Sequence, residues 1–348
     1  MTTVLCTLYN SLYLDKGLVL YDSLCECAKD FKLYVLCMDD KCYEVLTDLK
    51  QENHIPIKLS DFELGDEELL KAKGNRSFGE YCWTCTPSII KYIIEKYKEP
   101  ICTYIDADMY FYNDPQILID GMLNAGKSVM IVPHRFTKIN RHFERNGIYC
   151  VEFNTFLNTP NSLHVLRKWR SDCLECCTSV NDGVHFGDQK YLDEWPSRYA
   201  CVHVSSHKGA GVAPWNIQSY RLHNYCDNNI TLKNCKDGST FNLIFYHFQH
   251  ITYIKDNVVD IDVYNDKLYV QKKMVNLLYQ SYLKKTKQMA VDLEKQYCLK
   301  VQLYKHSIIN KSELPSFYER VKKLSICKIA KKIIFSFNKR FDVMVVPS

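Results

Sequence analysis

EYCWTCTPSIIKYIIEKYKEPICTYIDADMYF, residues 80–111, contains two periodicities from which the fold can be predicted. Apolar residues first recur at the spacing of an amphipathic helix, and a nearly continuous apolar run then begins at Ile101. Such a run predicts a buried strand. The strand ends in two acids, Asp106 and Asp108, with Ala107 between them. Because unpaired carboxylates are costly in a buried strand, we expect the two acids to have a ligand or partner.

Strands and helices alternate through the first third of the chain. Residues 2–9 (TTVLCTLY) and 31–40 (FKLYVLCMDD) are apolar enough for buried strands, and residues 14–28 between them have helical spacing. Alternation of this kind predicts a parallel sheet with helices on both faces, whose ligands bind at the carboxyl ends of the strands. The following residues fall at those ends: Thr7, Asp39, Asp106 and Asp108.

The alternation continues to about residue 255, and it predicts one α/β domain of residues 1–255. Further strands of this domain are predicted at 128–136, 149–158, 200–207 and 241–251. Residues 256–348 form a second region that is helical and basic in character. Within this region, residues 269–297 are rich in lysine and have the spacing of a helix.

The segment 319–341, ERVKKLSICKIAKKIIFSFNKRF, predicts a basic amphipathic helix. A helix of this kind suits an anionic membrane surface. The alternative is that it docks its apolar face on the rest of the protein while its lysines face solvent. Its apolar face comprises Ile326, Ile329, Ile333 and Phe337. Its basic residues are Lys322, Lys323, Lys328, Lys331, Lys332, Lys339 and Arg340.

The composition is that of a globular protein, with 348 residues and 47% hydrophobic content, enough for a sizeable core. The net charge of +5 is small for this length, and no nucleic-acid partner is predicted. No run of eighteen apolar residues is free of charge, so no membrane span is predicted. The 17 cysteines lack regular spacing, and the first residues lack a signal-peptide pattern. We therefore expect a cytoplasmic protein, with peripheral contact at the inner face of a membrane through the basic tail.

Two carboxylates separated by one small residue can share a divalent cation. One acid binds the ion directly and the other reaches it through ribose or water, while Ala107 lets the backbone approach a ligand closely. Mn²⁺ and Mg²⁺ prefer oxygen ligands, and they neutralise a diphosphate that is bound in the same site. Asp106 and Asp108 therefore indicate a metal site for a phosphorylated ligand.

Two classes of enzyme use such a pair of acids. A haloacid-dehalogenase-like phosphatase has an apolar strand before its DxD motif, and residues 187–193 (GDQKYLD) mimic the second acidic motif of that class. However, that class has Thr or Val where this chain has Tyr110, and its nucleophile usually lies near the N-terminus. The other class is the nucleotide-sugar glycosyltransferases, in which a nucleotide-binding half precedes the motif. A non-catalytic nucleotide-sugar-binding protein on the same fold is a third alternative.

Several segments, in the same order, resemble the glycosyltransferases of the glycogenin and bacterial lipopolysaccharide galactosyltransferase group. Residues 3–24 (TVLCTLYNSLYLDKGLVLYDSL) resemble their nucleoside-binding strand, loop and helix, and YIDADMYF resembles their metal motif. The other similar segments are FNTF with Asn154 and Thr155, GDQKYLD with Asp188 and Gln189, APWN at 213–216, and IFYHFQH at 244–250. The resemblance covers the first domain, and it implies a GT-A-like fold in which helices flank a Rossmann-type mixed sheet.

The resemblance also implies an activity: the metal-dependent transfer of a sugar, with retention, from a nucleotide-diphosphate donor that we expect to be a UDP-sugar. The expected acceptor is a glycan, a lipid-linked glycan or a protein. Mn²⁺ or Mg²⁺ would be held by Asp106, Asp108 and His247. Asp188 would hold sugar hydroxyls, and Gln189 would lie near the anomeric carbon. The expected donor-binding residues are Thr7, Asn10, Asp39, Arg76, Asp106, Ala107, Asn154 and Thr155.

The end of the domain departs from the family pattern. In the family the late histidine is followed by a glycine and then by Lys-Pro-Trp, which clamp the diphosphate. Here His250 stands at the glycine position, and no Lys-Pro-Trp follows His247. The clamping lysine is therefore missing, and Arg76 or Lys208 is expected to supply its charge.

A second register of the histidine motif is available. Residues 207–215 keep His, Pro and Trp at the family spacing, but they put Ala213 at the lysine position. We favour His247 as the metal ligand because it closes a long apolar strand after the APWN segment. His207 remains the alternative ligand.

Overall fold

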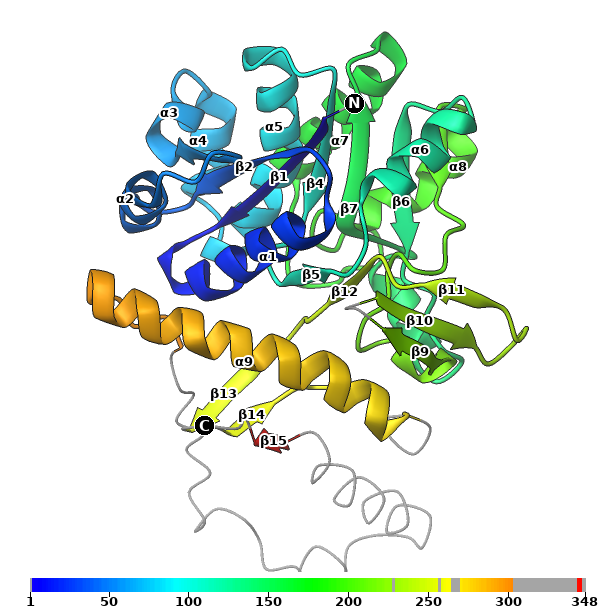
Figure 1. Ribbon diagram of the computed structural model, residues 1–348. Helices are drawn as coiled ribbons and strands as arrows, with labels where there is room; N and C mark the ends of the chain where they lie inside the picture. Colours follow the sequence, from blue (N-terminus) through cyan, green and yellow to red (C-terminus); the bar gives the residue numbers. More distant parts are fainter. Residues whose placement is uncertain (1, 227–228, 256–257, 264–269, 303–342, 346–348) are drawn as a thin grey trace, which may run out of the picture.

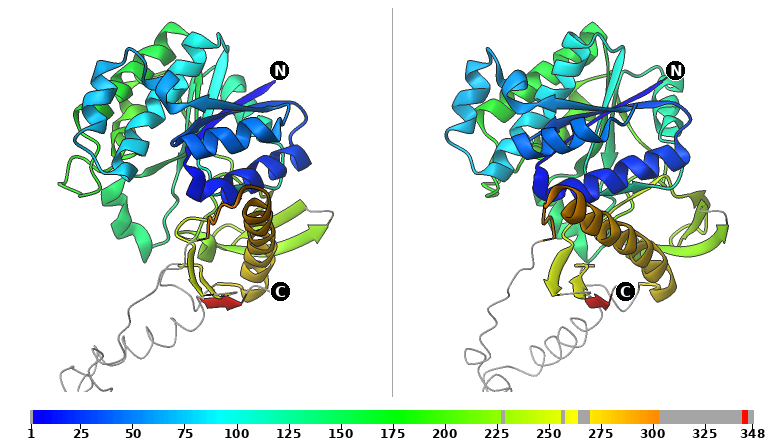
Figure 2. Two further views of the ribbon diagram at one scale, coloured as in Figure 1. Left: turned by 90° about the vertical axis from the view of Figure 1, so that its left-hand side faces the viewer. Right: turned by 60° about the vertical axis from the view of Figure 1, so that its left-hand side comes forward.

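The computed structural model describes residues 2–226, 229–255, 258–263, 270–302 and 343–345. Its centre is a sheet of seven strands in the order β3-β2-β1-β4-β7-β6-β8. Strand β7 runs antiparallel to both of its neighbours, and the other neighbouring strands are parallel to each other. Helices α5 and α7 pack together on one face of the sheet, and α1 and α6 lie on the other (Figures 1 and 2). The α/β fold class, a mixed sheet flanked by helices, is confirmed.

The central part of the molecule is built from short, regular elements. Its strands are β1 (Thr3–Tyr9), β2 (Phe31–Cys37), β3 (His54–Lys58), β4 (Ile101–Ile105), β6 (Val129–Pro133), β7 (Tyr149–Leu157) and β8 (Val202–Val204). Its α-helices are α1 (Leu14–Cys27), α2 (Asp40–Leu49), α3 (Leu59–Glu63), α4 (Glu67–Lys73), α5 (Phe78–Lys96), α6 (Gln116–Asn124), α7 (Pro160–Glu175) and α8 (Trp195–Arg198). Short 3₁₀ turns are η1 (Ser11–Tyr13), η2 (Asn140–Asn146), η3 (Lys190–Glu194) and η4 (Ile217–Ser219).

Helix α5 begins with a capping box formed by Ser77 and Glu80. The Ser77 hydroxyl accepts a hydrogen bond from the main-chain N–H of Glu80 (3.4 Å), and the Glu80 carboxylate accepts one from the N–H of Ser77 (3.0 Å). The helix packs against β4, whose five residues are all buried. Both elements predicted within residues 80–111 are thus confirmed, and β4 ends at Ile105, directly before the two acids.

Smaller sheets lie beyond the carboxyl ends of the parallel strands, in the lower half of Figure 1. Strand β5 pairs with β12, while β9, β10 and β11 form one antiparallel sheet and β13, β14 and β15 form another. Their bounds are β5 (Met109–Phe111), β9 (Tyr220–Cys226), β10 (Asn229–Asn234), β11 (Thr240–Asn242), β12 (Phe245–His247), β13 (Thr252–Lys255), β14 (Val258–Asp260) and β15 (Val343–Val345).

Helix α9 (Lys272–Tyr297) packs across α1 and supports β12 (Figure 1). The hydroxyls of Tyr246 and Tyr279 lie 2.9 Å apart, and the ring of Phe248 stacks on that of Tyr282 with 3.8 Å between centroids. These aromatic contacts belong to a second buried cluster beside the larger core of the central sheet. Helix α9 therefore fixes the strand that ends at His247.

The predicted helix at residues 269–297 is confirmed, because α9 spans most of it. The helix predicted at 319–341 lies outside the described residues, and the domain boundary at residue 255 stays a prediction. No helix within the described ranges has the length and apolar character that crossing a membrane requires.

Candidate functional site

A short strand pairing brings the predicted metal ligands together. Asp106 and Asp108 lie in the turn between β4 and β5. Strand β5 pairs with β12 so that Met109 lies opposite His247. The main-chain N–H of Phe248 also donates a hydrogen bond to the carbonyl of Asp108 (2.8 Å). This pairing places His247 beside two acids that come from a distant part of the chain.

The histidine contacts both acids through the same ring nitrogen. Nε2 of His247 lies 3.0 Å from Oδ1 of Asp108 and 3.7 Å from Oδ2 of Asp106. The imidazole is buried, whereas the Asp106 side chain keeps 30% of its surface exposed. His207, the alternative ligand, instead accepts a hydrogen bond at Nδ1 from the main-chain N–H of Gly209 (3.1 Å). The structure thus brings His247 to the acids.

These contacts change the pKa of all three groups. Burial raises the pKa of Asp106 to about 6, because the attraction of His247 only partly offsets it. Burial also acts to raise the pKa of Asp108, but attraction and hydrogen bonding by His247 outweigh it, and the pKa falls to about 2. Burial acts to lower the pKa of His247, and the charge of Asp108 nevertheless raises it well above its usual range. In the absence of a cation, a protonated His247 is the positive partner of the acids, and a bound divalent cation would take over that role and leave Nε2 unprotonated.

Another acid, which sequence reasoning missed, lies on the far side of the imidazole. Oε2 of Glu152 lies 2.7 Å from Nδ1 of His247, and Glu152 is fully buried in β7. Cys150 lies on the same strand, and its sulfur forms with Glu152 and His247 a group whose ligand atoms all lie within 4.8 Å of one another. The sequence signal for Glu152 was the same as for Asp106: a carboxylate inside an apolar strand.

Lys16, also missed, brings a cation to the site. It lies in the first turn of α1 and is buried, and its Nζ lies 3.6 Å from the centroid of the Tyr13 ring. Burial acts to lower the pKa of Lys16, but Tyr13, Asp108 and Asp15 together raise it above its usual value. The available signal was a lysine within the buried face of a helix. Lys16 therefore stays charged close to Asp108.

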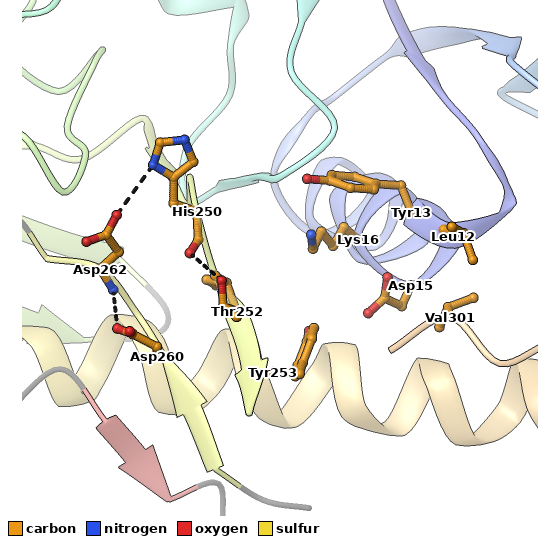
Figure 3. Close-up of a pocket in the computed structure, with 11 residues that line it drawn as sticks. Leu12, Tyr13, Asp15, Lys16, His250, Thr252, Tyr253, Asp260, Asp262 and Val301 are labelled. Carbon is orange, nitrogen blue, oxygen red and sulfur yellow. Dashed lines mark hydrogen bonds and ion pairs between the residues drawn. The ribbon is translucent and has the colours of Figure 1, made fainter. Parts of the chain in front are cut away.

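A cavity of about 590 Å³ opens beside Lys16 (Figure 3). The start of α1, with Tyr13 and Lys16, forms one wall, and residues of the segment 250–262 form the opposite wall. On that second wall, Nδ1 of His250 pairs with Oδ2 of Asp262 (3.5 Å). The Tyr13 side is partly open, because this residue is 40% exposed. The volume lies within the range of pockets that hold small ligands.

Asp188 belongs electrostatically to the same site, and Gln189 is held by a neighbouring loop. Burial raises the pKa of Asp188 to about 7, and the charge of Asp106 adds to this shift. The indole N–H of Trp169 donates a hydrogen bond to the main-chain carbonyl of Asp188 (2.8 Å). The side-chain amide of Gln189 donates one to the carbonyl of Asn146 (2.8 Å). Asp188 thus lies within range of the acids, and Gln189 is tied to the segment that precedes β7.

The residues predicted to contact the nucleoside surround the loop after β1. Asp39 accepts hydrogen bonds from the N–H (3.0 Å) and hydroxyl (2.8 Å) of Ser11 and from the N–H of Cys42 (2.7 Å). These bonds cap α2 and fix the loop. Asn10 is partly buried in that loop. Thr7 is fully buried in β1, and its hydroxyl has no hydrogen-bond partner among the described residues.

Asn154 and Thr155 point to opposite faces of β7, as successive strand residues do. The hydroxyl of Thr155 lies 2.9 Å from that of Thr103 in β4, so this side chain is engaged within the sheet. Asn154 is fully buried opposite Tyr104, and within the described part of the chain its amide has no hydrogen-bond partner. Thr155 is therefore not brought to the acids. Ala107 lies buried between the two acids.

The two basic residues expected to replace the clamping lysine have other partners. Arg76 donates a hydrogen bond to the carbonyl of Leu174 (2.7 Å), and Lys208 pairs with Asp237. In contrast, the charge of Lys16 acts to lower the pKa of Asp108. The structure therefore brings Lys16, rather than Arg76 or Lys208, to this side of the site.

The donors around the acids fit a divalent cation. Two carboxylates and the Nε2 atom of one imidazole face one another, and the other ring nitrogen is held by Glu152, as is typical of metal-binding histidines. A set with two oxygen donors suits Mn²⁺ or Mg²⁺, which complete their coordination with water or phosphate oxygens. The residues that fit the ion are Asp106, Asp108 and His247.

The comparison with solved structures found chains with a limited likeness to this one. Mouse xyloside xylosyltransferase 1, in its apo form, is 14% identical, and the likeness covers 72% of this chain and 98% of that chain with a TM-score of 0.46. The galactosyltransferase LgtC, in complex with donor and acceptor sugar analogues, is 12% identical. That likeness covers 71% of this chain and 87% of the LgtC chain, with a TM-score of 0.47.

No known protein-family model matches the chain, but two sequence relatives are substantial. YfnD of Bacillus subtilis is 33% identical over 258 residues, which cover 72% of this chain and 78% of YfnD. YfnF of the same organism is 30% identical over 292 residues, which cover 81% of this chain and 92% of YfnF. Both relatives are described as uncharacterized. The chain belongs to the same protein family as YfnD and YfnF.

Proposed function

We propose that this protein is a glycosyltransferase that depends on a divalent metal and uses a nucleotide-diphosphate sugar. One observation carries the proposal: Asp106, Asp108 and His247 meet at a buried site next to a cation and an open aromatic ring. The two acids and the imidazole can bind a metal ion. The ammonium of Lys16 suits a diphosphate, and the ring of Tyr13 suits a nucleobase. This combination fits a nucleotide-sugar better than it fits a simple phosphomonoester, and no observation supports the phosphatase alternative.

The metal would be Mn²⁺ or Mg²⁺, held by the two acids and His247. When bound, such an ion supplies positive charge that stabilises the diphosphate as it leaves the sugar. The buried ammonium of Lys16 adds a second positive charge to the same region. The ring of Tyr13, which is partly exposed beside the cavity, offers a face on which a nucleobase can stack.

The donor is proposed to be a UDP-sugar. Asn10, in the loop after β1, and Asp39, which binds that loop through Ser11, would contact the nucleoside. Asp188 would accept hydrogen bonds from sugar hydroxyls. Gln189 would lie near the anomeric carbon. A neutral amide is a weak nucleophile, so the proposed retention of configuration would follow from attack of the acceptor on the face that the diphosphate leaves.

The acceptor is proposed to be a glycan, a lipid-linked glycan or a protein. Two loops, residues 136–149 and 177–186, are the candidate walls of its site. They are joined by the side-chain amide of Asn181, which donates to the carbonyl of Arg145 (2.9 Å) and to Oδ1 of Asn146 (2.8 Å). The cytoplasmic location and the contact of the basic tail with an anionic membrane also remain proposals.

Two experiments test the proposed function. The first measures thermal stabilisation by UDP, GDP and CDP, each with Mn²⁺, and then donor hydrolysis with the best nucleotide. We expect UDP to give the largest shift. Absence of any shift, together with phosphate release from simple phosphomonoesters, would favour the phosphatase alternative. A UDP shift without hydrolysis or transfer would favour a non-catalytic binding protein.

The second experiment replaces Asp108 with Asn. We expect sugar transfer to fall by about 100-fold or more, because a charge that stabilises the leaving group is lost with the metal. Asp120→Asn, at an exposed position on α6, is the matched control. Transfer by Asp108→Asn at the wild-type rate without added metal would reject the metal role, and an inverted linkage in the product would reject retention.

A further inference from the structure

Glu152 lies on the opposite side of the His247 ring from the two acids. Its Oε2 atom lies 2.7 Å from Nδ1 of His247, while Nε2 of the same ring faces Asp108 at 3.0 Å. Glu152 is 0% exposed and His247 is 3% exposed, so water does not compete for the contact. Both nitrogens of the ring thus have carboxylate partners, but only Asp106 and Asp108 lie on the partly open side.

We propose that Glu152 is a positioning residue that presents Nε2 of His247 to the divalent metal. This inference rests on the proposed function, because the metal belongs to that function. The carboxylate accepts a hydrogen bond from Nδ1–H, which fixes the tautomer with a free lone pair on Nε2 and holds the plane of the ring. Without it, the ring could rotate or carry its proton on Nε2, where the lone pair is needed.

The surroundings of Glu152 keep it in this position. The main-chain N–H of Asp106 donates to the Glu152 carbonyl (3.4 Å), which links the two acids through the sheet. A Cβ atom at Gly211, where φ is +74°, would lie 3.1 Å from Oε1 of Glu152 and 3.2 Å from Nη1 of Arg135. The glycine therefore leaves room for the carboxylate and the guanidinium near each other.

Burial lowers the pKa of Arg135 and the charge of Glu152 acts to raise it, but among the described residues Oε1 of Glu152 has no hydrogen-bond partner. The guanidinium of Arg135 is anchored by main-chain carbonyls, from Nη1 to Ala210 (2.6 Å) and from Nη2 to Ser205 (2.8 Å). This arginine adopts φ of +49°, an uncommon value for a side chain of its size. The carbonyls hold the guanidinium in the region of Glu152, and the charge of Glu152 acts on it without a direct ion pair. Direct contacts run from Glu152 through His247 to the metal-motif acids.

A different role for Glu152 has a distinct signature. Cys150, Glu152 and His247 could themselves bind a thiophilic ion, because their ligand atoms lie within 4.8 Å of one another. A thiolate, an imidazole and a carboxylate are ligands of Zn²⁺ or Cd²⁺ rather than of Mg²⁺. In that arrangement Nδ1 would bind metal and could not donate to Glu152. The positioning role and the direct ligand role therefore exclude each other.

The test measures binding of Mn²⁺ alone, without nucleotide, to the full-length protein and its Glu152→Ala and Glu152→Gln variants. Loss of an outer carboxylate partner typically weakens metal binding by about 10- to 100-fold, and we expect this loss for Glu152→Ala. Glu152→Gln keeps a carbonyl acceptor for Nδ1–H, so we expect a smaller loss of Mn²⁺ affinity. If Glu152→Ala does not fold, Glu152→Gln serves as the test variant. Glu63→Gln, which changes a buried glutamate that pairs with Lys73 rather than with His247, is the matched control, and we expect it to keep the wild-type affinity.

A second readout separates positioning from a purely structural role. Nitrogen-15 NMR of the histidines at saturating Mg²⁺ reports which ring nitrogen of His247 carries the proton. We expect Nδ1–H in the wild type and a mixture of ring states in Glu152→Ala. A lower melting temperature with unchanged Mn²⁺ affinity and an unchanged His247 signal would overturn the proposal.

Failure of this inference is distinguishable from failure of the proposed function. If the wild type binds Mn²⁺ and the Glu152 variants bind it equally well, only the positioning role is rejected. If the wild type shows no saturable Mn²⁺ binding, the metal dependence and the positioning role are both rejected. A third outcome is a thiolate-to-Cd²⁺ absorption band that disappears in Cys150→Ser, together with competition between Cd²⁺ and Mn²⁺. This outcome would identify Cys150 as a metal ligand and would reject the positioning role of Glu152.

Discussion

Lys16 and Glu152 are two charged residues that are buried without being part of the two-acid motif. A buried charge is costly unless a partner compensates it. Glu152 has a partner within the protein, because Nδ1 of His247 lies 2.7 Å from its Oε2 atom. The ammonium of Lys16 lies over the ring of Tyr13, interacts with the charges of Asp108 and Asp15, and borders the cavity. At the scale of residues, Lys16 is therefore the cation of this cavity that we propose to contact the donor.

The role of Lys16 gives a prediction about donor binding. Hydrogen bonds to charged groups contribute about 1.5–3 kcal/mol, so Lys16→Gln should lower kcat/KM for the donor by about 10- to 100-fold. Lys16→Arg keeps the charge and should retain more of this activity. Lys41→Gln, at an exposed position on α2, is the control. The measurement is steady-state kinetics at varied donor concentration. An unchanged kcat/KM in Lys16→Gln would show that Lys16 does not contact the donor.

His54 gives a prediction about pH and stability. Burial lowers its pKa to about 3, against about 6.5 in an unfolded chain, so on acidification the unfolded chain takes up the proton first. The free energy of unfolding is unaffected by His54 above pH 6.5, and it falls by about 1.4 kcal/mol per pH unit below that value. His54→Gln should remove this part of the decline in urea unfolding between pH 6.5 and pH 5. The control His164→Gln changes an exposed histidine and should leave the decline intact.

At the scale of elements, the spacing of apolar residues predicted those helices and strands whose position depends only on which face is buried. The helix and strand within residues 80–111 were confirmed because their apolar spacing reports which face is buried. Periodicity showed that Glu152 and Lys16 are charges in buried segments, but it could not assign them to the site, since their neighbours come from β12 and from the segment 250–262. His247 was predicted from a resemblance rather than from spacing.

Other expectations depended on details that a linear pattern does not contain. The register of β7 against β4 places the hydroxyl of Thr155 next to that of Thr103 inside the sheet. The position of the last turn of α7 determines that Arg76 donates a hydrogen bond to the carbonyl of Leu174. A shift of one residue along a strand reverses the face on which a side chain lies. Individual donor contacts were therefore harder to predict than the fold.

The capping box of α5 gives a prediction that compares two substitutions. Ser77→Ala removes the cap and should lower the free energy of unfolding by about 1 kcal/mol. Glu80→Ala should do the same, and it also removes the carboxylate that accepts hydrogen bonds from the N–H and hydroxyl of Ser179 (both 2.8 Å). Only Glu80→Ala should therefore speed limited proteolysis within residues 177–186 and raise the acceptor KM. Equal proteolysis rates in the two variants would contradict this link between α5 and the loop.

At the scale of the whole molecule, the C-terminal region is partly joined to the rest. Helix α9 packs against α1 and β12, and β15 pairs with β14. Residue Met344 of β15 is buried. A deletion of the whole tail would therefore also remove β15, so substitutions are the cleaner way to examine the proposed membrane contact.

Replacing Lys328, Lys331 and Lys332 by Gln provides that test. A lysine near an anionic surface contributes about 1 kcal/mol, so the triple variant should bind anionic vesicles on the order of 100-fold more weakly than the wild type. Vesicles of neutral lipid are the control, and cosedimentation is the measurement. Equal binding of the triple variant and the wild type to anionic vesicles would reject the membrane contact of the tail.

The pairing of β5 with β12 has a consequence for how the protein is made. Asp108 leaves the ribosome long before His247, and α9, which supports β12, is synthesised later still. Contacts between distant parts of a chain form slowly because a large loop must close first. A nascent chain that ends before β12 would lack His247, one of the three proposed metal ligands. If the proposed site holds a divalent cation, its full set of ligands would exist only after β12 has been synthesised and has paired with β5.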